Sequence, residues 1–233
     1  MKPPATAFDR VARDYDAELN RGLALTGETR DFYARRRIAF LQACLARQNS
    51  RPRLVMDYGC GTGDTVPLLA GLPGVERVVG VDVSEESLAV ARERHGGEGR
   101  SFLLPADARV DAAHPFDLVY TNGVFHHIEP ADRPAAVRWI AERLRPGGLL
   151  AFWENNPWNP GTRWIMSRVP FDADAQPLSA PTARRLLRES GFTVLRADFH
   201  FVFPHGLRWL RWLERPLRRL PLGGQYQVLV SGN

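Results

Sequence analysis

Cysteine and lysine are scarce in this chain, and no long apolar run occurs. Its 233 residues contain two cysteines, Cys44 and Cys60, which stand far apart and form neither a CxxC pair nor a metal-binding spacing. No stretch reaches the ~18 to 20 apolar residues of a membrane span. The start, MKPPATAFDR, has no apolar signal-peptide segment. We therefore expect a cytoplasmic protein without a metal, peripheral to the membrane at most.

Positive charge comes almost entirely from arginine, because Lys2 is the one lysine. The formal net charge of +5 at pH 7 would suit an anionic partner. In a chain rich in alanine and proline, however, the preference for arginine could equally reflect coding composition. Net charge therefore leaves both interpretations open.

Strand-like and helix-like patterns alternate along the chain. Apolar runs of strand length lie at 53–59, 77–83, 101–104, 116–121, 148–153, 193–203 and 226–230. Helical patterns lie at 64–71, 84–95, 130–145 and 179–190, and Ser84 and Ser179 are expected N-caps. This alternation predicts an α/β fold, a Rossmann-like, seven-stranded, mostly parallel sheet with helices on both faces. Its ligand should lie at the carboxyl ends of the strands.

The stretch VMDYGCGTGD, residues 55–64, predicts a strand followed by a glycine-rich turn. The turn consists of Gly59, Cys60, Gly61, Thr62 and Gly63. Glycines permit positive φ and let a ligand lie against the backbone. A dinucleotide-binding turn would need a glycine where Asp64 stands, and the Lys-Ser/Thr pair of a phosphate-binding loop is absent. An acidic residue at this position favours a cationic ligand.

Two further acids follow the second and third predicted strands. Asp82 comes 19 residues after Gly63, where a carboxylate can accept both hydroxyls of a ribose. Asp107, in PADA, is placed where an acceptor can reach an adenine amino group. An adenosine without phosphates, joined to a cationic portion, describes S-adenosylmethionine.

Five motifs in order resemble those of class I S-adenosylmethionine-dependent methyltransferases, and are similar to the ubiquinone/menaquinone-biosynthesis type of small-molecule methyltransferase. They are VMDYGCGTGD, VGVDVS, PADA, FDLVYTNGVFHHI and LRPGGLLAFWEN, over roughly residues 53–155. The resemblance implies S-adenosylmethionine as cofactor. It implies the following contacts: Asp57 and the Gly59–Gly63 turn to the methionine portion, Asp82 to the ribose, Asp107 with Ala108 to the adenine, Asn122 with Gly123 near the transferable methyl, and Val83 within the same site.

Methyl transfer needs a general base only if the acceptor is protonated at working pH. His126 and His127 follow the fourth strand, and histidine titrates near neutral pH. Packing or hydrogen bonding is the alternative interpretation of these two rings. Glu154, which ends the fifth strand, is the second candidate base, and its alternative is a supporting hydrogen-bond acceptor.

The segments outside the motifs are expected to cover the cofactor and shape the acceptor pocket. Residues 1–50 resemble the N-terminal helical lid of related proteins, and 51–233 form the methyltransferase core. From the lid we expect Tyr15 and Arg37 to contact cofactor and Tyr33 to contact the acceptor. The insertion at 155–181 is long for a connection. Its expected acceptor contacts are Asn155, Trp158 and Trp164.

A second insertion, 204–222, is predicted to form an amphipathic helix that Pro216 kinks or divides. At ~100° per residue, one side carries Arg208, Arg211, Arg215, Arg218 and Arg219, and the other Trp209, Leu210, Leu213, Leu217 and Leu220. Two interpretations stay open. The helix packs on the domain, or it lies on a membrane surface beside the acceptor entrance.

The sequence therefore predicts an enzyme of small-molecule biosynthesis that methylates a small or lipid-like acceptor on O, C or N. A nucleic-acid or protein methyltransferase is one alternative, which the lack of an aromatic and basic array does not favour. A non-catalytic S-adenosylmethionine-binding protein is another. The oligomeric state stays open.

Overall fold

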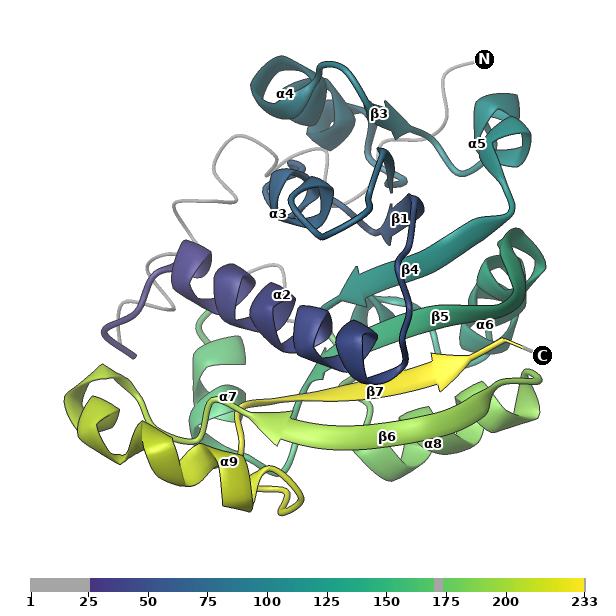
Figure 1. Cartoon of the computed structure of the whole chain (residues 1–233). Coiled ribbons are helices and arrows are strands. Elements are labelled where there is room, and N and C mark those ends of the chain that lie inside the picture. Colours follow the sequence, from purple (N-terminus) through teal and green to yellow (C-terminus); the bar gives the residue numbers. More distant parts are fainter. Residues whose placement is uncertain (1–25, 170–173, 233) are drawn as a thin grey trace.

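The computed structural model describes residues 26–169 and 174–232, which form one sheet with helices on both faces (Figure 1). The strands are β1 (Leu54–Tyr58), β2 (Arg77–Val81), β3 (Arg100–Leu103), β4 (Phe116–Asn122), β5 (Leu144–Asn155), β6 (Thr193–His200) and β7 (Gln225–Ser231). Their order is β3-β2-β1-β4-β5-β7-β6, and β7 alone in this sheet runs antiparallel to its neighbours. The predicted fold class is confirmed.

The helices are α2 (Arg30–Arg47), α3 (Val66–Ala70), α4 (Glu85–His95), α5 (Ala108–Ala113), α6 (Arg133–Arg143), α7 (Pro160–Met166), α8 (Ala180–Glu189) and α9 (Glu214–Leu217), with 3₁₀ segments η1 (Phe125–His127) and η3 (His205–Leu213). Ser84 and Ser179 cap α4 and α8 as predicted, each accepting a backbone N–H three residues on. The short helices α5 and α7 were not predicted, although side chains cap both: Asp107 accepts the N–H of Arg109, and Asn159 accepts the N–H of Thr162.

Alternate residues of the buried strands enter two apolar layers. Val55 packs in the layer that includes residues of α2, α3 and α4, and Met56 packs in the layer that includes residues of α5, α6 and α8. Successive side chains of a strand point to opposite faces of the sheet, so this alternation is expected of a strand covered on both faces. The order of strands reverses direction between β1 and β4, and a ligand crevice is expected at that point.

Helix α2 crosses one face of the sheet (Figure 1). Leu41, Cys44 and Leu45 are buried on it, in the same apolar cluster as Leu118 and Trp153. Its C-terminal half therefore belongs to the core, while its N-terminal half extends to the cavity described below. The division at residue 50 between a lid and a core stays a prediction.

The insertion at 204–222 differs from the predicted α-helix. It forms η3 with three residues per turn, interrupted at Leu207, and then the short α9. The insertion divides between η3 and α9, before Pro216. Pro216 lies in the first turn of α9, where its missing N–H removes no intrahelical hydrogen bond. Because residues i and i+3 eclipse one another in a 3₁₀ helix, Trp209 and Trp212 share one side. The predicted grouping of Trp209 with Leu210 and Leu213 is wrong. None of the described helices is long and apolar enough to cross a membrane.

Candidate active site

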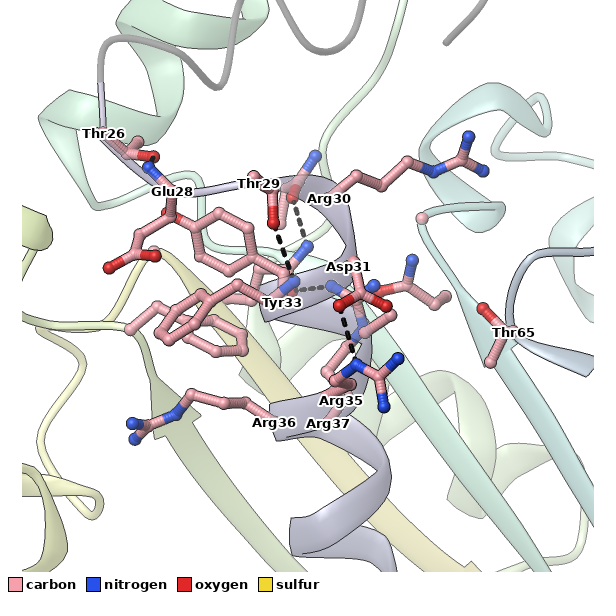
Figure 2. Close-up of a pocket in the computed structure, with 18 of the residues that line it drawn as sticks. Thr26, Glu28, Thr29, Arg30, Asp31, Tyr33, Arg35, Arg36, Arg37 and Thr65 are labelled. Carbon is pink, nitrogen blue, oxygen red and sulfur yellow. Dashed lines mark hydrogen bonds and ion pairs between the residues drawn. The ribbon is translucent and has the colours of Figure 1, made fainter. Parts of the chain in front are cut away.

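A cavity of about 1170 Å³ lies at the carboxyl ends of β1, β4 and β5. Its walls come from the glycine turn, η1, the first half of α2, α7 and the segment after β6. Figure 2 shows the start of α2, with Thr26, Glu28 and Tyr33 on one side and Arg30 and Thr65 on the other. Pockets for one small ligand commonly measure ~300 to 1,000 Å³, so this cavity has room for two bound molecules.

The glycine turn after β1 brings bare backbone to the cavity. Gly59 has φ of 74°, and a Cβ there would overlap the Val124 side chain, so the residue must be glycine. Gly61 has φ of 52° and a Cβ on it would meet nothing within 4 Å. Gly61 and Cys60 line the cavity, whereas Thr62 and Gly63 point into the protein.

Asp82 ties the end of β2 to the glycine turn. Its two carboxylate oxygens accept the N–H groups of Gly61, at 2.8 Å, and Ser84, at 2.9 Å. Neither Asp82 nor Val83 lines the cavity itself. The Val83 side chain is exposed after the end of β2, which is the neighbour of β1 in the sheet. Their predicted contacts with the cofactor stay predictions.

Asp107 follows β3, farther along the same edge of the sheet. It caps α5, and an ion pair of 2.6 Å with Arg109 is the main reason that its pKa falls to about 2. Asp107 and the exposed Ala108 are not part of the cavity wall. An adenine contact from this carboxylate would compete with Arg109, and the assignment stays a prediction.

Two buried acceptor atoms at the ends of β1 and β4 have no hydrogen-bond partner among the described residues. They are Oδ2 of Asp57 and Oδ1 of Asn122, and both residues line the cavity. Burial and the nearby Asp82 charge raise the pKa of Asp57 to about 7, against the lowering effect of Arg37. Buried acceptors normally have a donor, so a ligand with N–H groups, such as an ammonium, matches this end of the cavity.

Tyr33 and Arg37 stand four residues apart on α2, so both face the cavity. The Arg37 guanidinium is buried and donates to the Tyr120 hydroxyl, at 3.1 Å, and to Gln225 Oε1, at 3.0 Å. The Tyr33 ring packs edge-on against Phe201 at 4.8 Å between centroids. Tyr15, the other predicted contact from this region, lies outside the described residues.

His126 and Glu154 form a buried pair at the ends of β4 and β5. Glu154 Oε2 lies 2.6 Å from His126 Nδ1, and Oε1 accepts the Phe125 N–H at 2.7 Å. Burial raises the pKa of Glu154, but the charge of His126 and these hydrogen bonds outweigh it and hold the pKa below its usual range. His126 lines the cavity with His127, whose ring lies 4.0 Å from it between centroids. Glu154 is 1% exposed and lies behind them.

Residues that the sequence did not single out hold this pair in place. The buried Arg133 of α6 donates to the carbonyls of Ile128 and Gln176, at 2.9 and 2.6 Å, and the Gln176 N–H donates to the His126 carbonyl. An arginine in the first turn of a helix gives no signal of such a role. Asp64, interpreted as an acid at the cavity mouth, is paired with Arg30 at 2.8 Å.

The prediction that Trp158 and Trp164 form walls of the acceptor pocket is wrong. Trp158 is 53% exposed and Trp164 is 45% exposed, and neither lines the cavity. The Thr162 hydroxyl bonds the Gly224 carbonyl at 2.9 Å, which turns the Thr162, Ile165 and Met166 side of α7 inward. Arg168 stacks on the outward Trp164 ring.

Asn155, the third predicted acceptor contact in this insertion, does line the cavity. It accepts a hydrogen bond from Gln225 Nε2 at 3.0 Å. Two polar side chains thus stand together on a wall that is otherwise largely apolar. The apolar members of that wall are Tyr33, Ile165, Met166, Val169, Phe201 and Phe203.

Comparison with known proteins agrees with this geometry. A family model described as a methyltransferase domain matches residues 55–148. Trans-aconitate 2-methyltransferase of Variovorax paradoxus is 32% identical over 196 residues, which cover 76% of this chain and 74% of that protein. The chain belongs to the class I S-adenosylmethionine-dependent methyltransferases. Similarity to the quinone-biosynthesis type in particular stays a prediction.

Other relatives of this methyltransferase match over a shorter span. Trans-aconitate 2-methyltransferase of Streptomyces avermitilis is 31% identical over 137 residues, 57% of this chain and 50% of that protein. The chain thus spans about half the length of several curated relatives that it matches. Magnesium protoporphyrin IX methyltransferase from Synechocystis, solved with bound S-adenosylhomocysteine, has the same fold, with a TM-score of 0.63, 15% identity and coverage of 97% and 96%.

The cofactor of this family is S-adenosylmethionine, and the described residues fit it. The unpartnered oxygens of Asp57 and Asn122 match the ammonium group of its methionine portion. The open backbone at Gly61 leaves room for the chain that joins methionine to ribose. Arg37 lines the same cavity, and its guanidinium donates to Tyr120 and Gln225.

Cofactor affinity is expected to rise with pH through neutrality. Asp57 without ligand has a pKa of about 7, so it is mostly protonated at pH 6 and ionised at pH 8, and only the carboxylate attracts an ammonium. Binding then releases a proton, and S-adenosylhomocysteine should bind about tenfold more weakly at pH 6 than at pH 8. Calorimetry in buffers of different ionisation enthalpy measures the released proton. In Asp57→Asn the pH dependence should disappear, and an unchanged dependence would refute this assignment.

Proposed function

We propose that this chain transfers the methyl group of S-adenosylmethionine to a small-molecule acceptor, with His126 as general base and Glu154 as the residue that positions it. The observation that carries the proposal is the buried pair, 2.6 Å between His126 Nδ1 and Glu154 Oε2, beside a cavity that begins at the glycine turn. Membership of the methyltransferase family and relatives named as trans-aconitate 2-methyltransferase and O-methyltransferase support it.

The cofactor supplies an electrophilic methyl group on a sulfonium. The acceptor atom approaches that carbon from the side opposite to sulfur, so the protein has to align the two molecules and exclude water. Such alignment corresponds to effective molarities of up to ~10⁵ to 10⁸ M in well-oriented systems. In this proposal Asp57, Asn122 and the glycine turn hold the donor, and Asn155 and Gln225 orient the acceptor from the facing wall.

Proton transfer follows from the geometry of the pair. Glu154 is ionised at neutral pH because its pKa is lowered, so it accepts the Nδ1–H of His126 and fixes the ring and its tautomer. Nε2 then takes the proton from the acceptor hydroxyl or amine as the new bond to carbon forms. The carboxylate stabilises the imidazolium that results. Glu154, with both oxygens bonded inside the protein, is a positioning residue in this scheme.

The acceptor that suits this wall is amphiphilic, with one polar group beside Asn155 and Gln225 and an apolar body against Tyr33, Ile165 and Phe203. A nucleic-acid or protein substrate would need a site open enough for a chain. Most of the side chains named on this wall are instead apolar, which suits a small amphiphilic molecule.

The proposed function is tested by a transfer assay. Purified protein is incubated with methyl-labelled S-adenosylmethionine and, separately, trans-aconitate, an alkyl-substituted phenol, total RNA and a mixed protein extract. Labelled product from a small molecule supports the proposal. Labelled product from RNA or protein alone supports a nucleic-acid or protein methyltransferase instead. Cofactor binding by calorimetry with no product in any reaction supports a non-catalytic binding protein.

A further inference from the structure

The segment from η3 to β7 leaves its largest apolar side chains in water. Trp209 is 68% and Trp212 is 72% exposed, and neither η3 nor α9 has a buried residue. We call the exposed residues of this segment the tryptophan surface. It comprises Leu207, Arg208, Trp209, Trp212, Arg215, Arg219, Leu220 and Leu222.

One side of η3 is fixed to the segment that leads into α2, which determines where the tryptophans point. Arg211 pairs with Glu28 at 2.6 Å, and His205 lies 3.1 Å from the same carboxylate. Arg208 and Arg211, which follow the interruption at Leu207, form one column of the 3₁₀ helix, since residues three apart eclipse one another. Trp209 and Trp212 form a second column, turned away from α2 into solvent.

The tryptophan surface carries an excess of positive charge. Arg215 has no carboxylate within ion-pair distance in the described part of the chain, whereas Arg208 contacts the His205 ring, at 2.7 Å from Nη1 to Nε2. Arg219 reaches Asp198 only at 4.0 Å. The one acid of the segment, Glu214, is occupied by Arg36 at 2.9 Å and by two backbone N–H groups. The arginines beside the tryptophans are therefore available to an anionic partner.

We propose that the tryptophan surface binds the interface of an anionic lipid membrane. Paired tryptophans beside arginines match that interface, because indole rings partition to the headgroup boundary while guanidinium groups meet phosphates. The exposed tryptophans of η3 and the exposed Arg215 and Arg219 that follow them lie along one short segment, which suits a flat interface that is apolar beneath and anionic above. The occupant is identified by this charge complementarity and by the exposed indoles.

The surface also stands beside the cavity. Phe201 to Pro204, which lead into η3, line the cavity together with Arg211 and Glu214. The turn at Trp158 lies next to Leu222, because Asn159 Nδ2 bonds the Leu222 carbonyl at 2.8 Å. If the proposed function holds, an amphiphilic acceptor can pass from the membrane to the cavity along this rim.

The test measures binding of the full chain to vesicles of phosphatidylcholine alone and of phosphatidylcholine mixed with phosphatidylglycerol, by co-sedimentation. Wild type should sediment with the mixed vesicles and not with the neutral ones. Trp209→Ser/Trp212→Ser should weaken this binding at least about tenfold. Arg215→Gln/Arg219→Gln should weaken it about tenfold and flatten its salt dependence. The matched control is Arg185→Gln/Arg188→Gln on the exposed side of α8.

Quenching of tryptophan fluorescence by brominated lipid gives a second measurement, which should fall in the tryptophan variant. Because the substituted side chains are exposed, melting temperatures should stay within a few degrees of wild type. Absence of binding to mixed vesicles at low salt, or equal binding by wild type and both variants, overturns the proposal. S-adenosylhomocysteine binding, measured on the same samples, is expected to be unchanged in every variant. A failure of membrane binding is thereby separated from a failure of the proposed function.

Discussion

Replacement of His126 by asparagine is expected to lower kcat about 10²- to 10⁴-fold for an acceptor that is protonated at neutral pH, which is the usual contribution of a general base. Asparagine keeps a donor for Glu154 at the Nδ1 position, but it cannot take up the acceptor proton. Affinity for S-adenosylhomocysteine should change little, because in the proposed scheme the ring acts on the acceptor and Asp57 and the glycine turn hold the cofactor. Initial rates with the acceptor found in the transfer assay measure the effect.

Two further variants separate a base from a packing residue. His127→Asn, on the neighbouring ring, should leave kcat within about tenfold of wild type if His126 alone transfers the proton. Glu154→Gln should lower kcat less than His126→Asn does, and shift the pH profile of kcat, since the carboxylate acts through the imidazole. If His126→Asn keeps the wild-type rate and pH profile, the acceptor is already nucleophilic and His126 has a packing role.

Replacement of Asp82 by alanine is expected to weaken S-adenosylhomocysteine binding by about 10²- to 10⁴-fold. Two ribose hydroxyls bonded to a charged acceptor contribute ~1.5 to 3 kcal/mol each. The change also removes the acceptor for the N–H groups of Gly61 and Ser84, so the glycine turn loses its connection to β2. Isothermal titration gives the affinity. Thermal unfolding of the ligand-free protein gives the contribution of the two hydrogen bonds to stability.

The matched control for Asp82 is Asp111→Ala, which removes an exposed acid paired with Arg143. It should change affinity by less than a factor of about two, as for other surface substitutions. Asp82→Asn keeps acceptor oxygen and should recover part of the loss. An Asp82→Ala protein that binds within fivefold of wild type would show that the ribose is held elsewhere.

The sequence predicted the parts of the site that depend on strand ends. Parallel strands finish at one edge of a sheet, so polar residues that follow buried apolar runs meet there whatever the loops do. Asp57, Asn122 and Glu154 are of this kind, and the structure places all three at the same edge. The N-caps Ser84 and Ser179 were predictable because capping is decided within four residues.

The orientation of the insertions could not be read from the sequence, because contacts between distant segments decide it. Trp164 points outward because Thr162 is bonded to Gly224, sixty-two residues away. The tightening of 205–213 into a 3₁₀ helix accompanies the ion pairs of Arg211 with Glu28 and of Glu214 with Arg36. A periodicity of apolar residues carries no information about such partners.

Helix α2 forms a wall of the cavity and at the same time closes an apolar layer of the core. If the whole helix swung away to admit a ligand, Leu41 and Leu45 would meet water, at a cost of about 1.5 to 3 kcal/mol each. Ligand exchange is therefore directed to the parts of the rim that bury no apolar side chain, namely residues 26–29 and η3. Engineering of residence time should target that rim, whereas engineering of acceptor shape should target the inward side of the helix.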